Sequence, residues 1–300
     1  YIIFMIKSTL EAFKDLKINK NTLSIDQKKF LNSQGYLILK PSKFVSKNLK
    51  KISKIINKLI ISEGDKGGWE GKEKFYKSGK KFETNCDRLG NLIEKNLIFG
   101  KLILIPEVLA AAYEVIRGNI KVGGLNFRNP HAGYGEQSIH VDALPRKSKN
   151  ERFHGVVCFL SLDDSTINNG ATRIIPRSHK KIGWPDEYIK TEKRQKNEIR
   201  TIVKAGSIVV MNLNTWHAGA KNISGKKRRT IFIQIKRRNE DQLLNYKKYL
   251  SKKTKKNLDE VQSYLLGIRN EDRHQLIDSY SIGQYYRAKF KKDRNAVNSK

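Results

Sequence analysis

The chain has 300 residues, of which 38% are apolar and 9% aromatic, so it is long and apolar enough to bury a core of domain size. Its charge is lopsided, because 61 Lys and Arg stand against 29 Asp and Glu and give a formal net charge of +32. The two cysteines, Cys86 and Cys158, belong to no Cys-rich pattern, which argues against a disulfide framework or a zinc finger. So large a positive excess attracts polyanions, and a nucleic-acid-binding protein is therefore one hypothesis.

Nothing in the sequence predicts export or membrane insertion. The apolar run from Tyr1 to Ile6 is shorter than the core of a signal peptide, which takes about 7 to 15 residues, and no basic stretch precedes it. No run approaches the roughly 20 apolar residues of a membrane-spanning helix. We therefore expect a cytoplasmic protein without a membrane span, and the scarcity of cysteine fits a reducing compartment.

The N-terminal part, about 1–118, reads as a set of helices around one short strand. A helix is predicted from the Ser24 cap to Gly35, and a strand follows in the sequence YLIL, which Pro41 ends. Apolar residues at helical spacing then predict a longer amphipathic helix after a cap at Ser46. The remaining predictions in this part are a loop over 64–85 and helices over 88–99 and 106–117.

The middle of the chain, about 119–238, changes to short runs rich in Val, Ile and Phe that are separated by turn signals. Predicted strands cover 121–127, 138–142, 153–162, 171–175, 201–203, 207–212 and 229–235. Short strands in succession favour an antiparallel sandwich or jelly roll over alternating β and α units. Because about 239–300 reads as a polar helical extension, we expect one domain, 1–300, that is mainly β with flanking helices.

One pair of residues in the β region has the spacing of metal ligands. In the sequence QSIHVD, His140 and Asp142 stand two apart, and the period of a strand projects both side chains from one face. Far downstream His217 follows an apolar strand, and a jelly roll can bring the two strand ends together because its sheets fold over each other. Two imidazoles and one carboxylate leave open positions on a metal and suit a non-haem Fe(II) oxygenase.

An arginine downstream of His217 strengthens this interpretation. Arg228 shares one face of its predicted strand with Thr230 and Gln234, while three alternating isoleucines share the other face. If the isoleucines pack against helices, the arginine points into the roll, where a buried guanidinium requires a carboxylate partner. A dicarboxylic cosubstrate such as 2-oxoglutarate would provide one.

Four segments in order, GEQSIHVDA, NNGATRIIPRSH, AGSIVVMNLNTWHAGAKNIS and RRT, resemble the phytanoyl-CoA dioxygenase family of Fe(II)- and 2-oxoglutarate-dependent oxygenases. The resemblance runs from GYLIL to about residue 240 and implies a double-stranded β-helix core. It implies that His140, Asp142 and His217 are iron ligands and that Arg228 pairs with the distal carboxylate of 2-oxoglutarate. The implied cofactors are Fe(II), 2-oxoglutarate and O2, and the implied reaction is hydroxylation with release of succinate and CO2.

The sequence departs from the family at two positions. Gly219 stands where the family often has a small hydroxyl residue that contacts 2-oxoglutarate, and Thr230 is the candidate to replace that contact. Arg177 stands where the family usually has glycine in a turn. Gln137 and Asn126, beside the metal strand, are further candidates for binding the cosubstrate, and ordinary sheet or turn hydrogen bonds explain them equally well.

The remaining cysteine and histidine side chains have simpler interpretations. Cys158 stands in the apolar run GVVCFLSL and is expected to be a small core residue. PRSHK reads as a turn, so its histidine is not expected to bind iron. Packing or surface roles are expected for His131, His154, His179 and His274.

The substrate is predicted only as a class. Arginines that flank the motif strands would favour a small anionic molecule if they formed a cationic rim, and the alternative is that they are solvated. They are Arg128, Arg146, Arg173 and Arg177. Retention of Asp142 favours hydroxylation over halogenation, because a halide would need the place of that carboxylate.

Two alternatives to an oxygenase stay open, a basic nucleic-acid-binding protein and a catalytically inactive jelly-roll binding module. Against the first, lysines outnumber arginines and spread along nearly every segment, and no nucleic-acid-binding motif is present. Abundant Lys, Asn and Ile together also indicate a composition bias of the whole genome rather than a partner. We therefore expect no specific nucleic acid.

Overall fold

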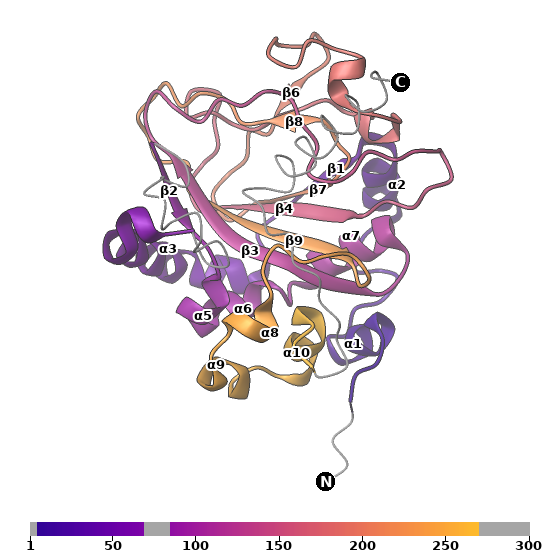
Figure 1. The fold of residues 1–300 in the computed structure, drawn as a ribbon, viewed down its shortest axis with the longest axis vertical. Coiled ribbons are helices and arrows are strands. Elements are labelled where there is room, and N and C mark those ends of the chain that lie inside the picture. The colour runs from indigo at the N-terminus through magenta and orange to yellow at the C-terminus, as the bar shows by residue number, and fades with distance from the viewer. Residues whose placement is uncertain (1–4, 69–84, 270–300) are drawn as a thin grey trace, which may run out of the picture.

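The computed structural model describes residues 5–68 and 85–269 of the chain. At its centre a six-stranded antiparallel sheet has the strand order β1-β7-β4-β9-β3-β2, and a smaller sheet, β6-β5-β8, lies above it (Figure 1). The strands are β1 (Tyr36–Leu39), β2 (Cys86–Leu89), β3 (Ile120–Pro130), β4 (Gly155–Ser161), β5 (Arg173–Ile174), β6 (Ile199–Arg200), β7 (Ile208–Asn212), β8 (His217–Ala218) and β9 (Thr230–Arg237). This arrangement confirms the prediction of a mainly β, jelly-roll core with flanking helices.

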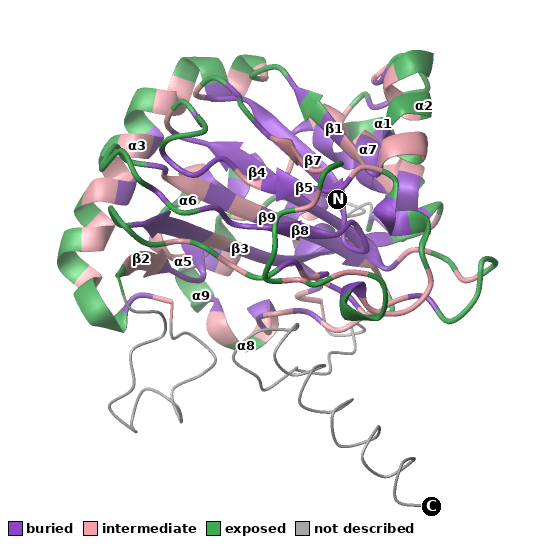
Figure 2. Ribbon diagram, turned by 90° about the horizontal axis from the view of Figure 1, so that it is seen from above, coloured by how far each residue is buried: buried purple, intermediate pink, exposed green. Residues whose placement is uncertain are grey.

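The helices lie before β3 and after β9 in the chain, with β1 and β2 among the first group. They are α1 (Thr9–Asp15), α2 (Ile25–Gln34), α3 (Lys43–Glu63), α5 (Leu92–Lys95), α6 (Leu97–Leu102), α7 (Pro106–Ile116), α8 (Tyr246–Tyr249), α9 (Lys252–Lys256) and α10 (Glu260–Leu266). In Figure 2 the outer faces of α2 and α3 are exposed, whereas the strands between them are largely buried. No helix in the described part of the chain is long and apolar enough to cross a bilayer.

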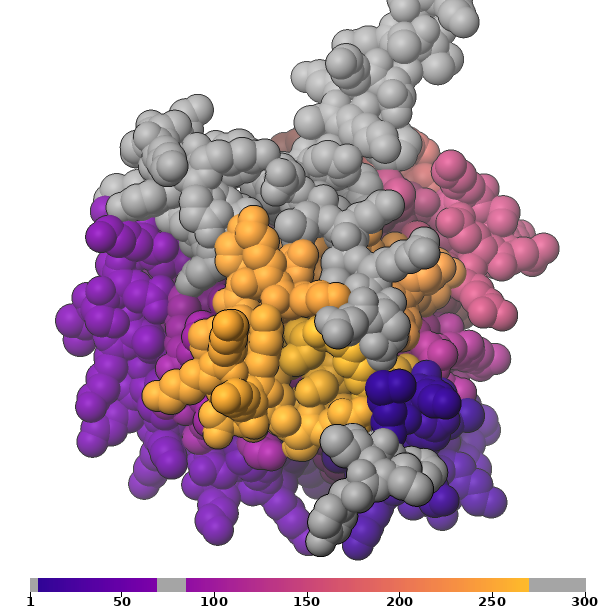
Figure 3. All heavy atoms as spheres, turned by 60° about the horizontal axis from the view of Figure 1, so that its bottom comes forward, coloured from indigo at the N-terminus to yellow at the C-terminus, as the bar shows by residue number. Residues whose placement is uncertain are grey.

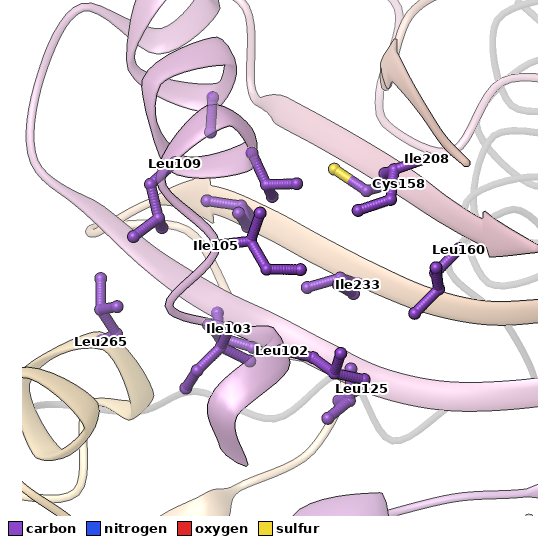
Figure 4. Packing of buried hydrophobic residues seen from close by; sticks show 14 of the residues in the cluster. Leu102, Ile103, Ile105, Leu109, Leu125, Cys158, Leu160, Ile208, Ile233 and Leu265 are labelled. Carbon is purple, nitrogen blue, oxygen red and sulfur yellow. The ribbon is translucent and has the colours of Figure 1, made fainter. Parts of the chain in front are cut away.

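The two faces of the large sheet have different neighbours. On one face the alternating isoleucines of β9 are buried in the main core, where α6 and α7 pack over β3, β4 and β9 (Figure 4). Leu102 and Ile105 from the helical side, with Leu125, Cys158 and Ile233 from the strands, belong to this layer. Burying one such side chain contributes about 1.5–3 kcal/mol, so this layer fixes the sheet against the helices. The opposite face of β9 is thereby directed toward the small sheet.

The predicted helix caps are right for α2 and wrong for α3. Ser24 forms a capping box with Gln27, as the sequence suggests. The helix after β1 begins at Lys43, because Ser42 is its N-cap and accepts a hydrogen bond from the amide of Val45. Ser46 therefore lies inside the first turn rather than before it.

Several other element predictions need correction. The helix expected over 88–99 is replaced by strand β2 followed by α5 and α6, since pairing with the edge of β3 overrides helical propensity there. The strand expected over 138–142 is a single bridge at His140, and those expected over 171–175 and 201–203 shorten or shift to β5 and β6. Most of the loop expected over 64–85 lies outside the described residues.

The C-terminal helices pack against the start of the chain. Figure 3 shows the segment of α8, α9 and α10 beside α1 at the lower end of the molecule. The hydroxyl groups of Thr9 and Tyr264 lie 3.1 Å apart, and the guanidinium of Arg238 stacks over the Tyr264 ring at 4.0 Å. These contacts connect the two ends of the described chain.

Candidate metal centre

The His-x-Asp segment crosses the small sheet next to β8. His140 and His217 form an antiparallel bridge, in which each backbone N–H donates to the other carbonyl at 2.9 and 3.0 Å. Ile139 precedes His140, and Val141 stands between His140 and Asp142. Both apolar residues are 2% exposed and pack with Trp216 in a separate apolar cluster. Because side chains alternate along an extended segment, this burial turns His140 and Asp142 to the opposite side.

Three ligand groups converge on one point. The Nε2 atoms of His140 and His217 lie 3.7 and 3.5 Å from the two carboxylate oxygens of Asp142. One ligand atom from each residue falls within 4.8 Å of the others, and no other such group of His, Cys, Asp or Glu occurs among the described residues. His217 is buried, while the other two are partly open to solvent. The donor set, two imidazoles and one carboxylate, fits a divalent iron site with open positions.

Backbone hydrogen bonds orient both imidazoles. Nδ1 of His140 contacts the carbonyl of Ser138 at 2.8 Å, and Nδ1 of His217 contacts the carbonyl of Thr215 at 3.0 Å. A carbonyl only accepts hydrogen bonds, so each Nδ1 carries the proton and each Nε2 presents a lone pair to the site. The hydrogen bonds thus orient both rings so that Nε2 faces the other ligand atoms.

A second layer of contacts fixes the strand that carries His217. The Ser178 hydroxyl accepts from the amide of Trp216 at 2.8 Å, and the Thr215 hydroxyl donates to the carbonyl of Gly35 at 2.9 Å. On the inner side, the Phe159 ring lies 6.2 Å from the His217 ring. Residues on either side of His217 are therefore tied down, which limits the motion of the imidazole.

Arg228 is buried close to the start of β9, as the orientation of the isoleucines predicts. It precedes the strand by two residues, so its expected place within the strand is wrong. Its amide donates to the side chain of Asn129 at 3.1 Å, and its guanidinium donates to the carbonyl of Gly170. Thr230 opens β9, is partly buried, and pairs with Arg128 of β3 across the ladder.

The departures at Gly219 and Arg177 have structural explanations. A Cβ atom at Gly219 would lie 2.5 Å from the carbonyl of Gly135 and 2.8 Å from Oε1 of Gln137. That Oε1 atom accepts a hydrogen bond from the Gly219 amide at 3.0 Å, so the Gln137 side chain occupies the room of the family's hydroxyl residue. Arg177 has φ of +67°, the left-handed conformation that glycine adopts readily. The turn is thus retained despite the arginine.

Asn126 and the four flanking arginines lie in different environments. Asn126 is half-buried on β3, directly across the ladder from Phe232. Arg146 donates to the carbonyls of Lys149 and Lys180, and Arg173 is 2% exposed and pairs with Glu198. The expectation of an arginine rim is therefore wrong for these two, because both side chains are used inside the protein.

The other two arginines expected at the rim, Arg128 and Arg177, differ in burial, and so does Arg229, the neighbour of Arg228. Arg177 is exposed on its turn, whereas Arg128 is buried. Arg229, next to Arg228, is partly buried and binds Asp163 at 2.6 Å and Asn57 at 2.9 Å. The ion pair with the Asp163 carboxylate explains why the Arg229 side chain is partly buried.

Three of the remaining histidines take structural roles, and His274 lies outside the described residues. His131 contacts Asp87 at 2.8 Å, and His154 contacts Glu240 at the same distance. His179 is buried against Phe153, and burial lowers its pKa to about 4. None of these imidazoles reaches the group around Asp142.

Sequence reasoning missed one residue that contacts Arg228 and one buried lysine of β9. Asn129 links the backbone of Arg228 to the carboxylate of Asp87, to which it donates at 2.7 Å. Lys236, near the end of β9, is 3% exposed. The alternation of β9 could have indicated Lys236, because it shares the face of Thr230 and Gln234; Asn129 has no comparable signal.

A jelly-roll core that brings together two imidazoles and one carboxylate is typical of non-haem Fe(II) oxygenases. The sequence model of the phytanoyl-CoA dioxygenase family (PhyH) matches residues 31–230, and the chain belongs to this family. Such enzymes use Fe(II), 2-oxoglutarate and O2.

Solved structures of similar fold are known. The carbocyclase SnoK from nogalamycin biosynthesis, described as non-heme and alpha-ketoglutarate-dependent, superposes with a TM-score of 0.56 at 16% identity, over 73% of this chain and 85% of SnoK. HygX from Streptomyces hygroscopicus, with nickel and 2-oxoglutarate bound, superposes with a TM-score of 0.58 at 12% identity, over 73% of this chain and 89% of HygX. At such low sequence identity, these superpositions show a shared fold alone.

Curated relatives match over a shorter stretch. Uncharacterized proteins of Mycobacterium tuberculosis and Mycobacterium bovis are each 34% identical over 87 residues. The match covers 29% of this chain and 30% of the length of either relative.

Proposed function

We propose that the chain is a 2-oxoglutarate-dependent dioxygenase that hydroxylates a small organic substrate and releases succinate and CO2. The convergence of His140, Asp142 and His217 carries the proposal, because their Nε2 and carboxylate atoms form a three-atom ligand set in the fold of this class. Iron, when bound there with 2-oxoglutarate, supplies the activation of O2 that the protein's own side chains cannot perform.

The protein's own groups would bind the metal and orient the ligand atoms around it. The carbonyls of Ser138 and Thr215 accept from the Nδ1 atoms, so both imidazoles would present Nε2 to the metal. Asp142 supplies the negative charge of the ligand set and occupies the place that a halide would need. Hydroxylation is therefore the reaction we propose, rather than halogenation.

The cosubstrate is assigned to the face of β9 that looks toward the small sheet. Arg228 offers a buried guanidinium for the distal carboxylate of 2-oxoglutarate, and Thr230, two residues further, offers a hydroxyl. Asn126 lies across the ladder on the same face and is a further candidate. Gln137 acts instead through the amide of Gly219, which it holds in place.

For the substrate we propose only a chemical class, and for the cellular location only a compartment. SnoK belongs to nogalamycin biosynthesis, and HygX has been solved with hygromycin B, so fold relatives act on or bind small molecules. A small-molecule substrate for this chain is proposed from that likeness. The two free cysteines favour a cytoplasmic protein, and the pairing of β1 and β2 with the core strands favours a single domain over 1–300.

Production of succinate from 2-oxoglutarate tests the reaction. We expect slow, substrate-independent succinate formation that requires both Fe(II) and O2, and we expect Asp142→Ala and His217→Ala to abolish it. The matched control is His179→Gln, which changes a buried imidazole outside the site and should leave the rate unchanged. Succinate formation that persists in both ligand variants would contradict the proposal.

A further inference from the structure

The outer face of the long helix α3 carries one row of lysine side chains, called here the lysine row. Each member lies three or four residues from another, which places them all on one side of the helix, within an arc of about 100°. They are Lys43, Lys47, Lys50, Lys51, Lys54 and Lys58. All six are exposed, and Figure 2 shows this face of α3 at the edge of the molecule. At a rise of 1.5 Å per residue the row is about 22 Å long.

The opposite face of α3 holds the helix against the sheet. Val45, Ile52 and Ile56 are 0% exposed and belong to the main core. The side chain of Asn57 accepts a hydrogen bond from Arg229 at 2.9 Å, which connects the helix to the start of β9. The lysine row is therefore presented by a fixed helix, and a partner would bind it without having to order that helix first.

No acidic side chain of α3 balances the lysine row. The helix contains no Asp or Glu before its last residue, Glu63, which binds Lys95 at 2.6 Å. None of the six lysines has an ion-pair partner within the described part of the chain. Helices α1 and α2, in contrast, mix acidic and basic residues. A concentrated charge of one sign on a rigid helix attracts an extended surface of the opposite sign.

An exposed isoleucine lies on the same side of α3 as the lysine row. Ile61 follows Lys54 by seven residues, which is close to two full turns, so its side chain continues the row. It is 84% exposed, more than any other large hydrophobic residue in the described part of the chain. A lipid interface accommodates both kinds of side chain, because lysines lie at its headgroups and an apolar side chain enters the layer beneath. Surfaces that bind single-stranded nucleic acid add arginine or aromatic side chains, and the row has neither.

We propose that the lysine row and Ile61 dock the protein on an anionic lipid surface, with the axis of α3 parallel to that surface. About four to eight basic residues on an amphipathic helix are typical of peripheral binding to anionic lipid. The lysines would lie among the headgroups, and Ile61 would enter the boundary of the acyl chains. The inference concerns where the protein acts and not which reaction it performs, so it is independent of the proposed oxygenase function.

Sedimentation with lipid vesicles tests this surface on the full chain. The vesicles contain phosphatidylcholine alone or with about one third phosphatidylserine, and the buffer has physiological salt. We expect binding to the anionic vesicles and none to the neutral ones. Lys47→Gln, Lys50→Gln and Lys54→Gln together should weaken binding about 100-fold, because each lysine near an anionic surface contributes a factor of about five.

The matched control removes three exposed lysines from α9, by Lys252→Gln, Lys253→Gln and Lys256→Gln together. The net charge falls by the same amount, so this variant should bind anionic vesicles almost as tightly as the wild type. Ile61→Ser should weaken binding to vesicles severalfold and leave binding to DNA at low salt unchanged, because DNA has no apolar layer. Equal loss of vesicle binding in the two triple variants, or a wild type that does not bind anionic vesicles, would overturn the proposal.

Duplex DNA at the same salt separates a lipid surface from a nucleic acid. We expect no DNA binding under these conditions. Binding to DNA that is tighter than binding to anionic vesicles, and that the α3 triple variant loses, would overturn the lipid surface in favour of a nucleic acid. Succinate formation should be equal in the α3 triple variant and the wild type, since the metal ligands are untouched. A wild type that binds anionic vesicles through α3 but forms no succinate would reject the oxygenase function alone.

Discussion

At the scale of single residues, Arg228 is positioned by a chain of side chains rather than by its strand. Its amide donates to Asn129, Asn129 donates to Asp87, and Asp87 contacts the half-exposed ring of His131. The carboxylate fixes the orientation of the Asn129 amide, so its oxygen faces Arg228. Asn129 is therefore a positioning residue for Arg228, which we propose as the partner of the cosubstrate.

Asn129→Ala should weaken 2-oxoglutarate binding without changing iron binding. Loss of one hydrogen bond that aligns the guanidinium is expected to cost about 1 kcal/mol, which is roughly a fivefold rise in the Kd or KM for 2-oxoglutarate. Titration of the cosubstrate against the iron-loaded protein measures it. An unchanged constant, or an equal loss of iron affinity, would show that Asn129 serves the fold only.

The buried Lys236 should make stability depend on pH in a defined direction. Its pKa in the folded protein, about 8, lies below the ordinary value of 10.5, so the folded state binds the proton less strongly than the unfolded chain does. Below pH 8 the penalty, about 3 kcal/mol, is fully present, and it disappears as the pH rises toward 10.5. The stability of Lys236→Met relative to wild type should thus be greatest at pH 7 and fall by pH 10. Urea unfolding at both pH values measures it, and a constant difference would be inconsistent with a strained lysine.

At the scale of elements, the turn at Arg177 connects the small sheet to α2. Its amide donates to the carbonyl of Gln34 at 2.9 Å, and the next residue, Ser178, holds the amide of Trp216. The backbone of Arg177 is left-handed, which costs a residue with a Cβ atom about 1–2 kcal/mol. The element that steadies His217 therefore contains local strain.

Arg177→Gly should raise the free energy of unfolding by about 1 kcal/mol, because glycine relieves the strain and loses part of that gain to its greater freedom when unfolded. Chemical denaturation measures the change. Arg177→Ala is the matched control, since it removes the same side chain and keeps the Cβ atom. Equal stabilisation by both variants would assign the effect to the charge instead.

Regular strands and caps were predictable, whereas elements set by partners distant in sequence were not. The YLIL strand and the Ser24 cap follow from local patterns. The alternation of residues in β9 correctly predicted that its isoleucines face the helices. Strand β2 was missed because its pairing with β3 decides its conformation. At the site, motif spacing gave the three residues that converge, but the place of Asn129 depends on Asp87, its neighbour across the sheet.

At the scale of the whole molecule, the net charge of +32 is spread over a β core whose polar site is internal. The long helix α3 carries lysines on its exposed face, and no described element presents a helix-turn-helix or zinc-binding pattern. Six Lys and Arg side chains among the described residues depart from this pattern because they are buried: Lys121, Arg128, Arg146, Arg173, Arg228 and Lys236.

Nucleic-acid binding should therefore be weak and generic. We expect fluorescence anisotropy to detect binding of duplex and single-stranded DNA at low salt and to lose it at physiological salt, because released counterions alone drive such binding. Tight binding that survives physiological salt, or that prefers one sequence, would favour the alternative of a nucleic-acid-binding protein.

The visible band that forms when 2-oxoglutarate chelates Fe(II) tests the central claim most directly. Anaerobic addition of both to the wild-type protein should produce the band, and His179→Gln should retain it as the control for a buried imidazole outside the site. His217→Ala and Asp142→Ala should lose it. A wild type without the band, or a band that persists in both ligand variants, would contradict the assignment of His140, Asp142 and His217 as the iron site.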